Sequence, residues 1–104
     1  MLSIRFDGER EWWVSGRVFE RLYLAALDSG SMPARLEHWR HVADANGGLT
    51  VSDLPRSEAD ELTAALRVTA ERELEGLAED GADPFDTTYR VSLAKLLKVL
   101  SETR

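Results

Sequence analysis

Cysteine is absent from this chain of 104 residues. Its absence excludes disulfide bridges, zinc sites built on thiolates and catalysis by a thiol nucleophile. No apolar run approaches the roughly 18 residues that a membrane-spanning helix needs, and the first residues lack the basic start and apolar stretch of a signal peptide. We therefore expect a protein without a membrane partner, and a cytoplasmic location is compatible with these absences.

Lysine is scarce, with 2 lysines against 11 arginines. Together with frequent alanine, this usage is typical of a GC-rich bacterial genome. Apolar residues make up 43% of the chain and charged residues 31%, as in ordinary folded proteins. The length is enough for one modest core. We expect a single domain over 1–104, with a β-hairpin at 2–14 and a helical body at 15–104.

The negative charge of the chain is concentrated in one predicted helix, at 57–80. This segment has eight acidic and two basic residues, a balance equal to the formal net charge of −6 of the whole chain. Glu71, Glu75 and Glu79 are spaced four residues apart and repel one another, which costs helix stability. Such a segment attracts basic partners and repels phosphate backbones. It predicts a basic protein partner and argues against nucleic acid.

The start of the chain predicts the β-hairpin. Apolar and polar residues alternate over 2–6, as in a strand with one buried face, and an Asp-Gly pair then marks a turn. A loop of three residues, 7–9, places Ile4 opposite Trp12. A shorter turn would shift the register, and Ile4 would then lie opposite a polar residue. We therefore predict that Trp12 faces inward and Trp13 outward.

Four helices are predicted after the hairpin, because apolar residues recur there at spacings of three and four and form one stripe per helix. The expected boundaries are Ser15 and Gly30 for the first helix, Pro33 and Asn46-Gly47-Gly48 for the second, a capping box at Ser57–Asp60 for the third, and Pro84 for the fourth. The segment 49–54 is a strand or a turn. The fold class is mainly α (α+β): a four-helix compact domain with a small N-terminal β-hairpin.

Two histidines form the best candidate for a chemical site. His38 and His41 share one face of the second predicted helix, and Asp44 lies three residues further. These side chains could hold a divalent ion or carry out acid–base catalysis. A zinc-protease helix, however, needs histidines four apart, and here the spacing is three. Surface histidines without a metal are the simpler interpretation, so we expect no cofactor. A small enzyme at these three residues is the alternative function.

Two other motifs fail on residue identity or charge. The segment from Asp44 is similar to an EF-hand calcium loop, but its sixth and twelfth positions are Leu49 and Pro55, where calcium binding needs glycine and a bidentate glutamate. The segment 49–54 with the helix after it is similar to the middle of a helix-turn-helix module. That helix is the most acidic part of the chain, so we do not expect it to bind duplex DNA.

The tryptophan pair and the acidic helix together suggest a binding function. Adjacent strand residues face opposite ways, and an exposed Trp13 is a typical anchor of a protein interface. We expect a non-enzymatic protein that binds another protein, with the interaction residues Trp13, Glu61, Glu71, Glu75 and Glu79. An immunity- or antitoxin-like role against a basic toxin or nuclease follows by analogy alone. The partner could also be a second copy of the chain, so a homodimer remains an open alternative.

Overall fold

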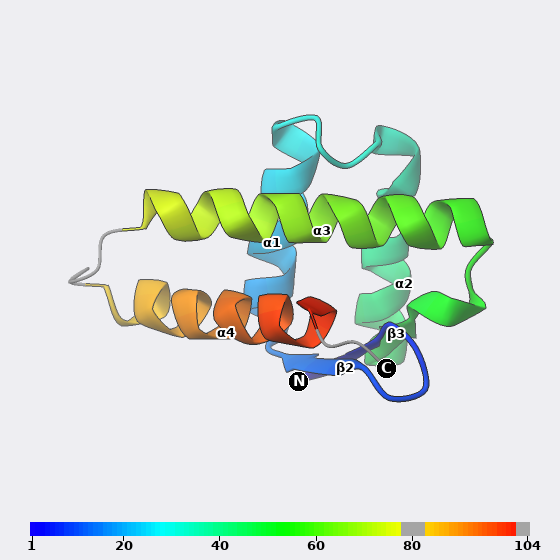
Figure 1. Ribbon diagram of the computed structural model, residues 1–104, viewed down its shortest axis with the longest axis horizontal. Coiled ribbons are helices and arrows are strands. Elements are labelled where there is room, and N and C mark those ends of the chain that lie inside the picture. Colours follow the sequence, from blue (N-terminus) through cyan, green and yellow to red (C-terminus); the bar gives the residue numbers. More distant parts are fainter. Residues whose placement is uncertain (78–82, 102–104) are drawn as a thin grey trace.

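The computed structural model describes residues 1–77 and 83–101. The elements in this part of the chain are β1 (Leu2–Arg5), β2 (Glu11–Val14), α1 (Gly16–Asp28), α2 (His38–Asn46), β3 (Gly48–Thr50), α3 (Arg56–Gly76) and α4 (Pro84–Ser101). Short 3-10 turns at Ala34–Leu36 (η1) and Val51–Asp53 (η2) precede α2 and α3. The predicted fold class is confirmed: the protein is mainly helical, with a small sheet at its N-terminal end (Figure 1).

β1 and β2 form the predicted hairpin in the predicted register, with Ile4 opposite Trp12. Asp7 fixes the loop, because its carboxylate accepts hydrogen bonds from two backbone N–H groups of the following residues. Trp12 is 1% exposed and Trp13 is 58% exposed. The prediction for the directions of the two tryptophans is therefore confirmed.

A third strand completes the sheet on the other side of β1. The segment 49–54, for which a strand or a turn was expected, contains both, because β3 is followed directly by η2. β3 runs parallel to β1, with Ile4 opposite Leu49, and the strand order is β2-β1-β3. A side chain at Gly48 would place its Cβ 2.3 Å from the carbonyl oxygen of Ser3. The close pairing of β3 with β1 thus depends on this glycine.

Two predicted helix starts are wrong. α3 begins at Arg56, and its start has no side-chain cap, so the capping box expected at Ser57–Asp60 does not form. Pro55 holds an extended conformation immediately before the helix, and the next residue can then take the first helical position. Similarly, Pro33 precedes η1, and α2 itself begins at His38. α3 ends at Gly76, with Leu77 as its C-cap, and the remaining residues of the predicted helix, 78–80, lie outside the described residues.

The core lies where the inward face of the sheet meets the helices. α3 and α4 run antiparallel side by side (Figure 1). The large buried aromatic side chains each satisfy their polar atom. The Trp12 indole N–H donates to the carbonyl oxygen of Ser92 at 3.0 Å, and the Tyr23 hydroxyl donates to the carbonyl oxygen of Leu36. Within residues 1–77 and 83–101, no helix is both long and apolar enough to span a membrane.

Candidate functional site

The acids of α3 fall into two groups rather than one continuous line. Glu58, Asp60 and Glu61 lie in the first two turns, and Glu71, Glu73 and Glu75 lie in the last two. The residues between them, 62–70, include no acid and one base, Arg67. With a rise of 1.5 Å per residue, the two groups are roughly 15 Å apart. The predicted interaction residue Glu79 lies outside the described residues, as does Asp80.

Half of these carboxylates have partners inside the protein. Arg35, from η1, donates to Glu61, and this hydrogen bond holds the pKa of the Glu61 carboxyl below its usual value. Glu58 accepts a hydrogen bond from the Trp39 indole N–H at 3.2 Å, and Glu73 accepts one from the Tyr89 hydroxyl at 2.9 Å. Because of these contacts, the three carboxylates are not free to bind a partner protein.

The other three acids of α3, Asp60, Glu71 and Glu75, are exposed to solvent. In the described part of the chain none of the three forms an ion pair. They therefore carry the negative charge that α3 offers to a partner.

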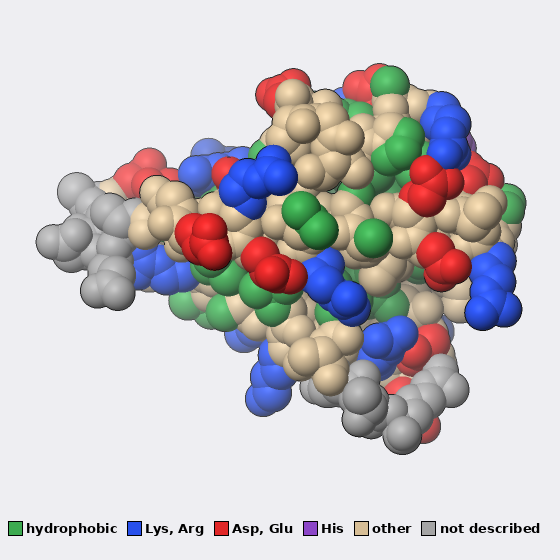
Figure 2. Space-filling view, turned by 45° about the horizontal axis from the view of Figure 1, so that its top comes forward, with side chains coloured by type: hydrophobic (Ala, Val, Ile, Leu, Met, Phe, Trp, Pro, Cys, Tyr) green, Lys and Arg blue, Asp and Glu red, His purple; other side chains and the backbone are tan. Residues whose placement is uncertain are grey.

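An apolar hollow separates the two acidic groups. It has a volume of about 300 Å³ and is lined by Ser31, Pro33, Glu61, Ala64, Ala65 and Val68. We call it the α3 notch. Val68 is 46% exposed, and Figure 2 shows hydrophobic side chains over the middle of α3 with acidic ones toward both ends. An apolar centre inside a charged rim is the usual arrangement of a protein-binding surface.

Trp13 lies in different, basic surroundings. It lines a hollow of about 340 Å³ with Lys95, Lys98 and Val99 of α4, and its indole N–H donates to Glu11 at 2.9 Å. α4 contacts both β2 and α3 and lies between them (Figure 1). The structure therefore confirms that Trp13 is exposed but does not bring it together with the acids of α3.

The two histidines and Asp44 are not part of any possible metal-ligand group among the described residues. His38, His41 and Asp44 are all exposed on α2. The His38 Nδ1 atom lies 3.0 Å from the carbonyl oxygen of Arg35, and its ring packs against that of Trp39. Among the residues that the structure describes, no group of three or more His, Asp and Glu side chains could hold a metal ion. The alternative function therefore gains no support from these three residues.

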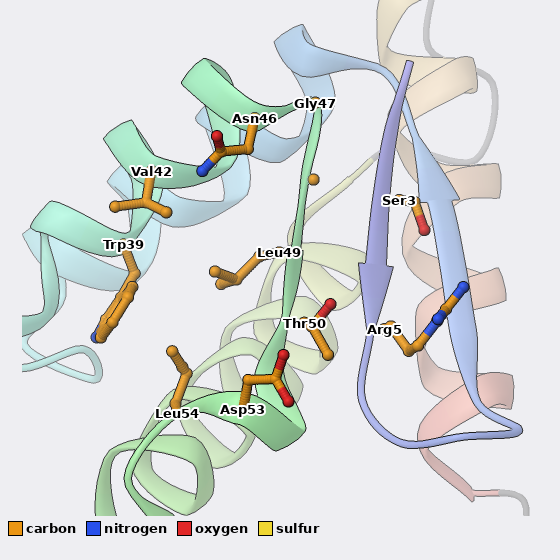
Figure 3. A pocket seen from close by; sticks show the side chains of 11 residues that line it. Ser3, Arg5, Trp39, Val42, Asn46, Gly47, Leu49, Thr50, Asp53 and Leu54 are labelled. Carbon is orange, nitrogen blue, oxygen red and sulfur yellow. The ribbon is translucent and has the colours of Figure 1, made fainter.

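A hollow that was not predicted from the sequence, about 510 Å³ in volume, lies between α2 and β3 (Figure 3). We call it the β3 groove. Trp39, Val42, Leu49 and Leu54 form its apolar wall. Polar side chains stand at its two ends, Asn46 at one and Asp53 at the other (Figure 3). The only sequence signal that could have indicated it is the spacing of three between Trp39 and Val42, which places both on one face of the second predicted helix.

Comparisons of the chain with protein-family models, with curated proteins and with solved structures gave no match.

Proposed function

We propose that the protein is not an enzyme and that it acts by binding a basic protein partner at the α3 notch and its acidic rim. The single observation that supports this proposal is the apolar hollow between the two acidic groups of α3. Its contact centre would be Ala64 and Val68, and its rim the free carboxylates of Asp60, Glu71 and Glu75. Glu61 also lines the notch, but its charge is paired with Arg35. Trp13 is then an anchor for a separate contact, because α4 lies between it and α3.

The two parts of this surface contribute differently to binding. Burial of the exposed Val68 side chain supplies affinity, because apolar area removed from water is the main favourable term in association. The carboxylates of the rim attract a basic partner during the encounter and fix its orientation. We therefore expect a fast association that weakens as salt increases.

An immunity- or antitoxin-like role is the particular form of this proposal. A small acidic protein that covers a basic toxin or nuclease needs an exposed surface of this kind, and the analogy extends no further than charge and shape. A cytoplasmic location belongs to the same proposal and is supported by the absence of cysteine.

The test is to recover binding proteins from the source cells and to compare two variants of matched charge change. Glu71→Lys alters the rim of the α3 notch, and Glu9→Lys makes the same change in the exposed hairpin loop. For the recovered basic partner, we expect Glu71→Lys to lower the association rate roughly 3- to 10-fold, as for a rim charge, and Glu9→Lys to leave it almost unchanged. Stopped-flow measurements at low and physiological salt provide the rates. Association that is indifferent to ionic strength would exclude the acidic rim as the driving feature.

A further inference from the structure

β3 is an edge strand whose outer side is unpaired. The Ser3 N–H donates to the carbonyl oxygen of Gly47 at 3.2 Å, and Ser3 is the pairing partner of Gly48. In a parallel ladder the main-chain groups of alternate residues point to opposite neighbours. The N–H and C=O groups of Leu49 therefore point toward β1, and those of Gly48 and Thr50 point away from β1. In the described part of the chain, the two Gly48 groups and the Thr50 N–H form no backbone hydrogen bond on that side, whereas the Thr50 carbonyl stands at the start of the 3-10 turn η2 as its N-cap.

The β3 groove follows this unpaired edge. Its volume of about 510 Å³ compares with about 300 Å³ for the α3 notch, and the two hollows have no lining residue in common. Trp39 and Val42 of α2 face the edge across the groove (Figure 3). The Trp39 ring is held in place, because its N–H is bonded to Glu58. The groove thus combines unpaired main-chain groups with a rigid apolar wall.

The unneutralised charge of the groove is negative. Arg5 is paired with Glu11 at 3.0 Å, so its positive charge is compensated within the sheet. Asp53 is exposed at the end of the groove near Leu54 and forms no ion pair among the described residues. A ligand that follows the edge of β3 therefore meets a free carboxylate, which favours a basic side chain.

We propose that the β3 groove binds an extended peptide segment of another protein, which adds to the sheet as a fourth strand beside β3. Its main chain bonds to Gly48 and Thr50, an apolar side chain packs against Trp39 and Val42, and a lysine or arginine lies beside Asp53. Strand addition of this kind takes affinity from main-chain hydrogen bonds and specificity from alternate side chains. This inference goes beyond the α3 notch and does not depend on it.

The experiment begins with a random peptide library displayed on phage and selected on the immobilised protein. Peptides that also bind the Val42→Glu variant, in which a charge enters the apolar wall, are removed. Enriched peptides are synthesised and added to ¹⁵N-labelled protein, and the amide signals are followed by NMR. We expect an apolar residue next to a basic one in the selected peptides, and shifts of the Gly48 and Thr50 amide signals.

Methylation of the peptide nitrogens separates strand addition from side-chain binding. A peptide methylated at alternate residues loses the N–H groups that face β3 in one register and keeps them in the other. We expect at least a tenfold loss of affinity for one methylated form and almost none for the other. Equal affinities of the two forms would overturn the proposal.

Two further variants keep the test independent of folding and of the α3 notch. Asp53→Asn changes an exposed residue, and we expect it to weaken binding several-fold and to reduce the salt dependence. Val68→Glu changes the α3 notch and should leave peptide binding unchanged. A lack of peptides enriched over the Val42→Glu variant would overturn the proposal, as would shifts at Ala64 and Val68 in place of Gly48. Concentration-dependent dimerisation through the same edge would also overturn it, because a second copy would then be the occupant.

Discussion

Replacement of Gly48 by alanine tests the pairing of β3 with β1 more directly than any other change. The new Cβ would lie 2.3 Å from the carbonyl oxygen of Ser3, 3.1 Å from its nitrogen and 3.2 Å from its carbonyl carbon. Carbon and oxygen atoms in close contact between strands are normally about 3.3 Å or more apart. All three contacts are with backbone atoms, so no side-chain rotation can relieve them. We expect β3 to move away from β1 by about 1 Å.

The cost of this movement has two parts. Extra volume in a close-packed region typically costs about 1–3 kcal/mol, and each weakened hydrogen bond of the β1–β3 ladder adds about 0.5–1.5 kcal/mol. We expect the free energy of unfolding to fall by about 3 kcal/mol. In a domain of this size that corresponds to a melting temperature lower by roughly 12–24 °C.

Two other glycines provide matched controls. Gly47 has φ +73° but open space around a Cβ, so alanine there costs about 1–2 kcal/mol for the left-handed backbone alone. Gly8 has neither a positive φ nor a neighbour within 4 Å, and alanine there should be within about 0.5 kcal/mol of the parent. Thermal unfolding followed by circular dichroism gives the three values. Equal melting temperatures for the Gly48→Ala and Gly8→Ala variants would refute the close approach of β3 to β1.

Three further measurements follow from buried polar groups. Tyr23→Phe removes the hydroxyl that bonds to the Leu36 carbonyl and should lower stability by about 1–2 kcal/mol in urea unfolding; an unchanged midpoint would contradict this. Thr69 is 2% exposed, and its hydroxyl has no partner among the described residues, so Thr69→Val should raise stability by about 1 kcal/mol, and a loss of stability would show that the hydroxyl is bonded. Burial raises the pKa of Tyr23 and Tyr89 above the usual value. Because the unfolded chain then loses its phenolic protons first, the contribution of the two tyrosines to stability should be constant below about pH 10 and fall above it. Phenolate absorbance of the folded protein at the ordinary pKa would contradict that expectation.

The parts of the fold that depend on local pattern could be predicted from the sequence. The inward direction of Trp12 and the outward direction of Trp13 could be predicted from the alternation of apolar and polar residues and from the length of the loop at 7–9. The helices could be predicted from apolar residues spaced three and four apart. The capping box at Ser57 failed because a proline stands two residues earlier, and the extended backbone at Pro55 moves the helix start.

β3 and its groove depend on non-local contacts, which the sequence pattern does not reveal. The three residues of β3 are too few to show the alternation of apolar and polar side chains that is typical of a strand. Gly47 and Gly48 are also accounted for as the end of the second predicted helix. The acids of α3 were visible in the sequence, but their partners were not, because Arg35 and Trp39 meet Glu61 and Glu58 only in the folded chain. Charge counted along the sequence therefore overstated the charge that α3 presents to solvent.

The position of β1 in the middle of the sheet has a consequence for synthesis of the protein. β1 and β2 leave the ribosome together, but β3 follows roughly 45 residues after β1. At about 5–20 residues per second, one side of the nascent β1 waits about 2–9 s for its neighbour. An isolated two-stranded hairpin is marginal in water, so during this interval the apolar face around Ile4 is available to chaperones and to other nascent chains. Slower translation before codon 48 should lengthen that exposure and raise the fraction of chains that aggregate.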